Sequence, residues 1–356
     1  METELLLSTF SSLLRVTLHT RWGLRRVETV DCGRGIYFGL TRGNSRIFAV
    51  ARNLDIHKRV QARGAPTNSI LVFSEPLRGL PPRVVQNPGV RDLHQIRFRD
   101  ELIWLVSGRS PELLAIDPNT GRSVGHIFLS RFLPLSLRHE APAQHPEDPY
   151  HFNSLHFGDF RLFVLAHNWW YGSFVMEFEY HTPEKFLRAP RLLRIWPVMG
   201  QQSHDLFHDG TRLLTLDSGG SRLISSDGIE RPVGHGMSGQ DFLRGMAVGE
   251  RFLFVGHGRQ SRYDREDRAD GPTRISVVHR TSMEVVSVVE VGSFGNTCDL
   301  LLLSEPDQSD SGCFKYSSIP GMVAAGSSGR NLDGPNGTRQ CTGACANPLQ
   351  SPSPTS

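Results

Sequence analysis

Short apolar runs separated by polar turns recur along the chain. Typical runs are residues 102–106, 161–165 and 252–255, and each follows a turn that contains Asp, Glu or Gly. Runs of this length, rich in Val, Ile, Leu and Phe and bounded by turn residues, are typical of β-strands, and helical periodicity is scarce. The pattern predicts an all-β fold.

The predicted strands fall into a repeating unit of a short segment, a polar turn and an apolar strand. A second strand pair follows, as in residues 113–121. Four-stranded units of about 40–60 residues have the size of propeller blades, so the sequence predicts a single β-propeller. The clear copies of the unit are residues 92–106, 152–165, 203–216 and 243–255, and a weaker copy covers residues 35–50.

Five such units fit between about Arg21 and Glu305, and the prediction is therefore five blades. Residues 297–303 are expected to close the ring with the first unit. Six blades remain an alternative because residues 55–87 and 131–150 are long.

Both ends of the chain are expected to lie outside the propeller, which is assigned to residues 21–305. Residues 1–20 contain several leucines but begin with acidic Glu2 and Glu4, which argues against a signal peptide and favours a short helix or extension. Residues 306–356 are dominated by Ser, Gly, Pro, Asn and Thr, a composition typical of a disordered tail.

Composition narrows the classes of partner and compartment. The net charge of +3 is small for 356 residues, and no concentrated basic stripe of the kind that binds nucleic acid is present. No apolar stretch is long enough to span a bilayer. The five cysteines are odd in number and lack zinc-finger spacing, so they are interpreted as free thiols. The expected location is cytoplasmic, without nucleic-acid or membrane partners.

Alignment of the repeats by their turns places His94, Asn153, His204 and Arg244 at equivalent positions. The first strand of each propeller blade lines the central channel, so these side chains are expected to converge at one mouth. His151 lies two residues before Asn153 and is expected to face the same side of its strand. His156, of the opposite parity, is expected to pack between blades.

Three converging imidazoles form a candidate metal site. His94, His151 and His204 are the predicted ligands of zinc, iron, copper or manganese, since neutral imidazole suits all four, and Asp205 is a candidate carboxylate partner. His94 and His204, together with Arg244, are the candidate catalytic residues.

The same mouth is a candidate substrate site. Arg244 can hold a carboxylate or phosphate by its two-pronged donor edge, and Asn153 can donate or accept a hydrogen bond. Trp170 belongs to the aromatic segment 168–171 and is a candidate for stacking on a ligand. For each histidine alone, a hydrogen-bonded structural role is the alternative.

The motifs around these residues resemble those of an uncharacterised bacterial β-propeller family of unknown function. Its members show an HD-type motif, an HLNGL-type motif, a PHSP-type motif followed by LLDSG, and an RGLA-type motif followed by FVG. The matching residues span about 90–303, and the resemblance implies that His94, His151, Asn153, His204 and Arg244 occupy the motif positions. This sequence departs from those motifs at Gln95, Ser154 and Asp205.

Three functions are compatible with the pattern. The first is a metal-dependent enzyme, a lyase, hydrolase or oxidoreductase, that acts on a small polar or anionic metabolite. The second is a non-catalytic module that binds a small molecule in the same pocket, and the third is a protein-interaction scaffold. Fold alone does not decide among them, and it leaves the oligomeric state open.

Overall fold

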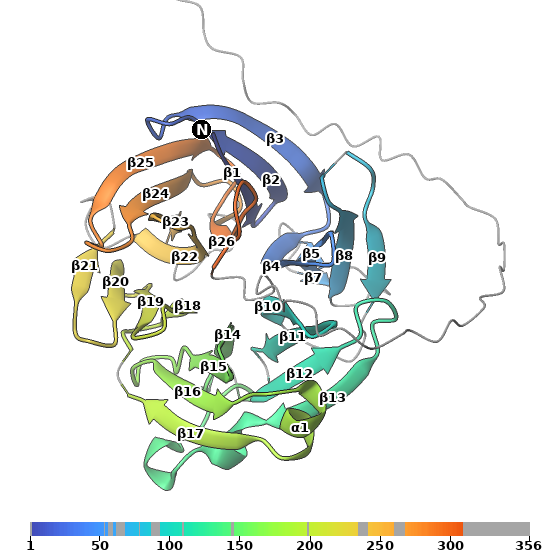
Figure 1. The fold of residues 1–356 in the computed structure, drawn as a ribbon, viewed down its shortest axis with the longest axis vertical. Coiled ribbons are helices and arrows are strands. Elements are labelled where there is room, and N and C mark those ends of the chain that lie inside the picture. Colours follow the sequence, from blue (N-terminus) through green and yellow to red (C-terminus); the bar gives the residue numbers. More distant parts are fainter. Residues whose placement is uncertain are drawn as a thin grey trace, which may run out of the picture. The chain divides into compact units, whose positions relative to one another are not determined.

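The computed structural model describes residues 2–52, 54–55, 60–61, 68–77, 79–86, 93–108, 110–143, 146–197, 199–233, 241–259 and 268–308. All of them lie in one compact unit, residues 1–313. They form six antiparallel four-stranded sheets arranged in a ring (Figure 1). The prediction of an all-β propeller is confirmed, with six blades in place of the expected five.

Each blade runs outward from an inner strand at the channel to an outer strand at the rim (Figure 1). Five blades are built from consecutive segments of the chain. The first blade contains β4 (Ile36–Gly43), β5 (Arg46–Arg52), β8 (Ser69–Ser74) and β9 (Arg83–Gln86), and the second contains β10 (Leu93–Arg99), β11 (Leu102–Ser107), β12 (Glu112–Ile116) and β13 (Ser123–Phe128). The third blade contains β14 (Phe152–Gly158), β15 (Arg161–Ala166), β16 (Phe174–Glu179) and β17 (Arg191–Trp196), and the fourth contains β18 (His204–His208), β19 (Leu213–Asp217), β20 (Arg222–Ser225) and β21 (Glu230–Pro232). The fifth blade contains β22 (Asp241–Val248), β23 (Phe252–Arg259), β24 (Thr273–His279) and β25 (Val285–Gly292).

The sixth blade joins the two ends of the ring. Its inner strand is β26 (Thr297–Leu302), which pairs antiparallel with β1 (Thr3–Thr9), and β2 (Ser12–Leu18) and β3 (Leu24–Cys32) follow. Residues 297–303 thus close the ring, but against the N-terminal segment and not against the first predicted unit.

The predicted N-terminal helix is therefore wrong. Leu5 and Leu7 pack in one hydrophobic cluster, whereas Leu6, on the opposite face of the same strand, packs in another. A propeller strand is covered on both faces by neighbouring blades, so its apolar residues run consecutively and do not alternate with polar ones. A short consecutive apolar run does not by itself distinguish a buried strand from a helix.

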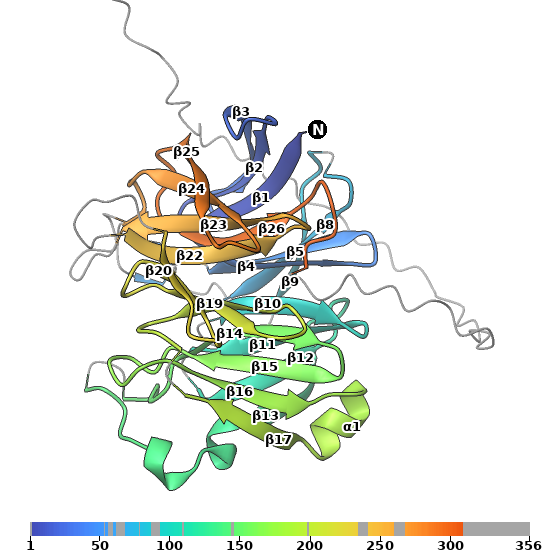
Figure 2. The same cartoon turned by 60° about the vertical axis from the view of Figure 1, so that its left-hand side comes forward.

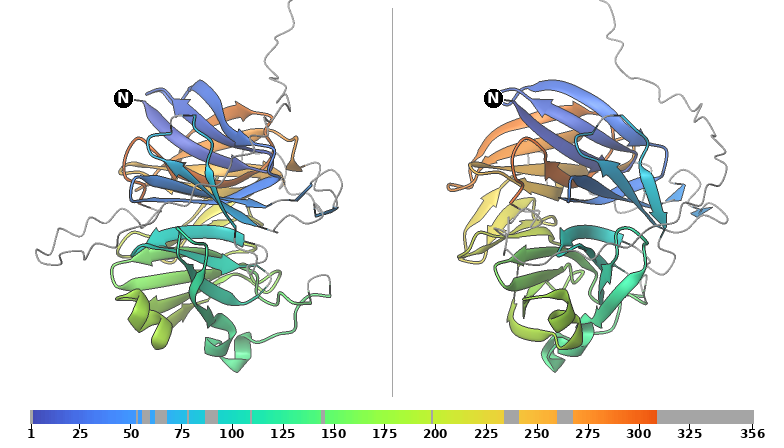
Figure 3. Two further views of the ribbon diagram at one scale, coloured as in Figure 1. Left: turned by 90° about the vertical axis from the view of Figure 1, so that its right-hand side faces the viewer. Right: turned by 45° about the vertical axis from the view of Figure 1, so that its right-hand side comes forward.

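Side chains between facing sheets hold the blades together, and Figures 2 and 3 show these sheets stacked face to face. Trp104 of β11 is fully buried, and its ring lies 5.7 Å from the rings of Phe157 and Tyr180 in the next blade. Phe186 of the short helix α1 (Pro183–Arg188) covers the same indole. These aromatic side chains belong to the hydrophobic cluster that joins the two blades.

Small elements connect the strands. They are the paired β6 (Leu54–Asp55) and β7 (Val60–Gln61), and the 3-10 turns η1 (Leu129–Phe132) and η2 (Leu135–Leu137). None of the helices in the described part of the chain combines the length and the apolar character needed to cross a bilayer.

The packed structure extends three residues beyond the predicted boundary at 305. Asp307 is fully buried, and its carboxylate accepts hydrogen bonds from the backbone N–H groups of Val248 (2.9 Å) and Leu302 (2.7 Å). The N–H of Gln308 donates to the carbonyl of Val248. The rest of the predicted tail, residues 309–356, lies outside the described residues.

Two cysteines belong to the described residues. Cys298 is a free, buried thiol, whereas Cys32 is disulfide-bonded. The interpretation of all five cysteines as free thiols is therefore wrong at Cys32. Disulfides are rare in reducing compartments, so the bonded Cys32 does not support the expected cytoplasmic location. That location stays a prediction.

Candidate functional site

Every inner strand carries an irregularity in its pairing with the next strand. Such bulges turn side chains away from the regular ladder, here toward the channel. In β10, for example, pairing skips from Leu93 to Ile96 and leaves His94 and Gln95 at the bulge. The residues at or beside the six bulges are Phe38–Gly39, His94–Gln95, Asn153–Ser154, His204–Asp205, Arg244–Gly245 and Cys298–Asp299.

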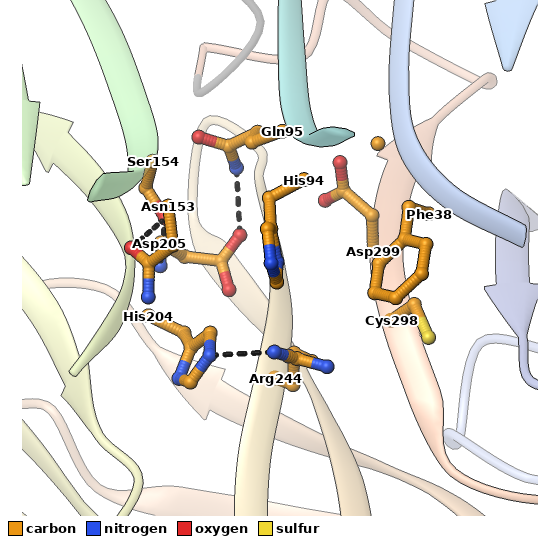
Figure 4. A pocket seen from close by; sticks show the side chains of 11 residues that line it. Phe38, His94, Gln95, Asn153, Ser154, His204, Asp205, Arg244, Cys298 and Asp299 are labelled. Carbon is orange, nitrogen blue, oxygen red and sulfur yellow. Dashed lines mark hydrogen bonds between the residues drawn. The ribbon is translucent and has the colours of Figure 1, made fainter. Parts of the chain in front are cut away.

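Eleven of these twelve residues, all except Gly245, line one pocket at the centre of the ring (Figure 4). The pocket encloses about 240 Å³, including the part open to solvent. The space clear of side chains is only about the size of one water molecule. The pocket therefore has room for a small polar group, and a larger ligand would have to extend out of it.

The predicted convergence of His94, Asn153, His204 and Arg244 is what the structure has. Phe38 and Cys298, at the bulges of the other two inner strands, also line the pocket. The sequence did not predict them because the repeat copies around them are weak. Cys298 sits in the closing strand and Phe38 in the faintest repeat, so neither could be placed in register by the turn and the apolar strand that follow.

The second residues of four bulges, and Thr41 of β4, tie each blade to the next. Side-chain oxygens on one inner strand accept hydrogen bonds from backbone N–H groups on the neighbouring inner strand. Buried backbone N–H groups at or near the bulges thus find acceptors. The bonds run from Leu40 N to Asp299 Oδ2 (2.8 Å), from Phe98 N to Thr41 Oγ1 (2.8 Å), from Leu155 N to Gln95 Oε1 (2.9 Å), from Asp205 N to Ser154 Oγ (2.8 Å) and from Gly245 N to Asp205 Oδ2 (2.7 Å). We call this set the inter-blade belt.

Gly245 completes the belt by allowing close approach. Its φ is +85°, and a Cβ at this position would lie 2.9 Å from the backbone C and Cα atoms of Asp299. The strands β22 and β26 pack at this point without a side chain between them, which only glycine permits.

Two buried carboxyls, Asp205 and Asp299, form the floor of the pocket. Gln95 donates from Nε2 to Asp205 (2.8 Å), and the buried Arg97 lies 3.8 Å from Asp299. Burial raises the pKa of Asp205 to about 6, against the opposing effects of the Gly245 N–H and Arg97. Burial also raises the pKa of Asp299 well above its ordinary value, although Arg97 opposes this, and the nearby Asp205 adds to the rise.

Arg244 and His204 form the most informative pair. Nη2 of Arg244 lies 2.7 Å from Nε2 of His204. A guanidinium only donates, so Nε2 of the imidazole is the acceptor and the ring proton is on Nδ1. That Nδ1 lies 2.9 Å from the carbonyl of Gln202 and 2.9 Å from Oγ of Ser218. Burial, followed by the charge of Arg244, lowers the pKa of His204 well below its ordinary value, so the ring is neutral.

The guanidinium of Arg244 is flanked by aromatic rings. Its Cζ lies 5.7 Å from the ring centroid of Phe38 and 5.9 Å from that of Phe242. Within the described ranges, no carboxylate lies at ion-pair distance from it. The cation is thus held by ring faces and a neutral imidazole.

Four imidazoles form a row beside Arg244. The ring centroids of His94 and His151 are 4.8 Å apart, those of His151 and His167 are 5.1 Å apart, and those of His167 and His204 are 5.4 Å apart. His151 also contacts Asp148, with Nδ1 2.5 Å from Oδ2. We call these four residues the histidine row.

His167 was not predicted. It follows β15, whose last residue pairs with the first residue of β14. The antiparallel return of the chain brings His167 back beside His151, and this relationship follows from strand pairing and not from repeat position.

The predicted metal ligands do not form one ligand set in this arrangement. His204 already accepts from a cation at Nε2, and His167 lies between His151 and His204. In the part of the chain that the structure describes, no group of three or more His, Cys, Asp or Glu is arranged to hold a metal ion. A zinc, iron, copper or manganese site stays a prediction without support from these contacts.

Trp170 does not line the pocket. It is 58% exposed, whereas the neighbouring Trp169 lies against His151 (4.9 Å) and His167 (5.4 Å). His156 packs between blades as expected, since its ring contacts Phe163 and Phe207, which lie on β15 and β18.

Comparison with known proteins supports the fold alone. No family model and no curated protein matches the chain. A chain in the crystal structure of a nidogen/laminin complex superposes with a TM-score of 0.56 at 10% identity, covering 85% of this chain and 100% of the other. A protein of unknown function from Bacteroides caccae gives 0.52 at 11% identity, covering 86% and 100%. The resemblance to one uncharacterised bacterial family therefore stays a prediction.

Proposed function

We propose that the channel mouth binds a small organic anion, with Arg244 as the group that holds its carboxylate or phosphate. The observation that carries the proposal is the pairing of this half-buried cation with the neutral ring of His204 across 2.7 Å, with no carboxylate of the described residues at ion-pair distance. A cation partly removed from water and paired only with neutral groups is a favourable position for an anion.

The shape of the site supports the same proposal. Phe38 and Phe242 flank the guanidinium, so its orientation is fixed before a ligand arrives. Asn153 is fixed as well, because its amide donates to the carbonyl of Ser203 (2.9 Å) and accepts from Ser154 (3.0 Å). Because the clear space is about one water in size, one oxygen of the anionic group fits there and the rest of the ligand lies in the mouth.

Calorimetric titration with acetate, inorganic phosphate and larger carboxylates and phosphates tests this proposal. Arg244→Gln is expected to weaken binding by about 10-fold or more, because a charge-assisted hydrogen bond is lost. The matched control is Arg280→Gln, since Arg280 is also half-buried over an aromatic ring, that of Phe207, but does not line the pocket. Equal affinity in wild type and Arg244→Gln would exclude the proposed role.

A second candidate function is proton transfer to or from the bound ligand. It is favoured by the contact between His151 and Asp148, in which a carboxylate fixes the imidazole through Nδ1. Asp148 is itself held, because Oδ1 accepts from the backbone N–H of His151 (2.7 Å). In a hydrolysis, the other nitrogen of His151 would take a proton from water as the hydroxide adds to the ester carbon, and would return it to the leaving alkoxide.

Hydrolysis assays with carboxylate-bearing and phosphate-bearing esters separate this candidate from binding alone. Turnover that falls by at least about 100-fold in His151→Gln would support general-base catalysis. His181→Gln is the control, because His181 also contacts a carboxylate, that of Glu179, but is exposed. Ligand binding without turnover by the wild type would leave only the binding function.

A further inference from the structure

An aromatic segment lies at the edge of the site and is not used by the proposed anion pocket. Trp169, Trp170 and Tyr171 are consecutive and connect β15 to β16. Trp170 and Tyr171 are each 58% exposed, which is unusual for residues of this size. Large exposed aromatic side chains next to a pocket commonly mark a ligand surface.

Hydrogen bonds hold this segment in place. Asn168 donates from Nδ2 to the carbonyl of Gly172 (2.7 Å), and its Oδ1 lies 2.6 Å from Nε2 of His139. The indole N–H of Trp169 donates to the carbonyl of Asp148 (2.9 Å). The rings are thus presented by a fixed backbone, and little ordering entropy would be lost when a ligand binds.

One face of Tyr171 is already covered. Its ring stacks on His139 at a centroid distance of 4.3 Å and an angle of 28°. Because Tyr171 is nevertheless 58% exposed, much of the ring remains accessible to a ligand while His139 supports it.

The aromatic segment is continuous with the anion pocket. The ring of Trp170 lies 6.4 Å from that of Trp169, and Trp169 contacts His151 and His167 of the histidine row. His151 in turn contacts His94, which lines the pocket. Ring contacts run from His204, the partner of Arg244, through His167 and Trp169 to Trp170. A ligand that contacts both Arg244 and Trp170 is therefore longer than one small ring.

The angles between the rings restrict what can stack on them. Trp170 is inclined by 48° to Trp169 and by 38° to Tyr171, with centroids 6.4 and 6.0 Å apart. A flat base is gripped best between parallel rings, which this arrangement lacks. A chain of sugar rings suits it better, because each sugar lays one C–H face on one aromatic ring and successive sugars turn relative to one another.

We propose that Trp170 and Tyr171 are a stacking subsite for the sugar rings of a short acidic oligosaccharide whose carboxylate is held by Arg244. This inference rests on the proposed anion-binding function and names the ligand class. The narrow pocket receives one carboxylate oxygen, and the neighbouring sugars lie along the mouth over the aromatic segment.

Titration of the full chain with a uronic acid trisaccharide, followed by tryptophan fluorescence and calorimetry, tests the inference. The double variant Trp170→Ala/Tyr171→Ala is expected to bind the trisaccharide about 10-fold more weakly or worse, since each stacking contact contributes to affinity. The same variant is expected to bind acetate and inorganic phosphate as the wild type does, because these probes do not reach the aromatic segment.

The matched control is Phe160→Ala. Phe160 is 53% exposed, but it lies in the turn between β14 and β15, at the opposite end of these strands from Trp170. Its removal is expected to leave trisaccharide affinity unchanged. A neutral trisaccharide is expected to bind at least about 10-fold more weakly than the acidic one, because it lacks the partner of Arg244.

The outcomes separate the inference from the function on which it rests. If Arg244→Gln weakens acetate binding but the double variant binds the trisaccharide normally, the saccharide subsite is wrong and the anion pocket stands. If small anions bind but no acidic trisaccharide does, the result is the same. If Arg244→Gln changes the binding of no anion, the proposed function itself fails.

Discussion

Arg244 donates a hydrogen bond from Nη2 to Nε2 of His204 across 2.7 Å, joining the inner strands of two adjacent blades. Because the guanidinium keeps its proton under all ordinary conditions, it fixes the tautomer of the imidazole. The imidazole in turn holds the guanidinium toward the pocket. Charge state and position are thus coupled between two side chains 40 residues apart.

His204 is expected to make stability depend on pH. Its pKa is well below 6.5 in the folded protein, first through burial and then through Arg244. As pH falls through about 6.5, His204 binds a proton in the unfolded chain but not in the folded protein, so the folded state loses stability. His204→Gln removes this loss. Urea unfolding should show that lowering the pH from about 7.5 to about 5 reduces the free energy of unfolding less in the variant than in the wild type.

Wild-type protein and the variant share the buried Asp205, whose raised pKa acts in the opposite direction, so the comparison isolates His204. An equal difference between the two proteins at both pH values would mean that the ring is not kept neutral by its surroundings.

Gly245→Ala is expected to destabilise the propeller by more than about 2 kcal/mol, because a positive φ and a contact with the backbone of Asp299 act together. Chemical denaturation measures the change. Gly210→Ala is the control: Gly210 has a φ of +98° but open space around its Cβ position, so only the backbone conformation is penalised, by roughly 1–2 kcal/mol. Equal losses would show that the close approach of β22 and β26 contributes nothing.

Ser154→Ala is expected to cost about 1–3 kcal/mol, since the buried N–H of Asp205 loses its acceptor in the inter-blade belt. The substitution removes a single oxygen and is otherwise conservative. Ser123→Ala removes an exposed hydroxyl and should change the free energy of unfolding by less than about 0.5 kcal/mol. A neutral Ser154→Ala would argue that the belt is not needed to hold the blades together.

Metal analysis of untagged protein is expected to find well under one equivalent of transition metal, unchanged in His94→Ala. The reason is that His204 already accepts a hydrogen bond from a cation at the nitrogen a metal would use. One equivalent of zinc, iron, copper or manganese that disappears in His94→Ala would instead restore the metal-site hypothesis.

Repeat register was enough to predict four of the pocket residues. His94, Asn153, His204 and Arg244 precede strong turn-and-strand signals that fix their position within a blade, and all four line the same pocket. The N-terminal strand was beyond this approach, because its leucines are consecutive and its partner strand is nearly 300 residues away, as in the pairing of Leu5 with Leu302.

Side chains on loops were the other limit. Which of Trp169 and Trp170 turns inward depends on the hydrogen bond from the Trp169 indole to Asp148, and no periodicity encodes this. His167 likewise joins the histidine row through the return of β15 alongside β14. Such relationships require a three-dimensional arrangement before the residue types become informative.

The pairing of β26 with β1 has a consequence for biosynthesis. The ribosome makes β1 first and β26 last among the strands of the ring, so β1 must wait without its inner partner until nearly 300 further residues have been added. Cys298 and Asp299, which complete the pocket wall and the inter-blade belt, arrive on that same strand. A chain stopped short of β26 would therefore carry an open sheet edge and no finished site, and ligand binding would distinguish completed molecules from truncated ones.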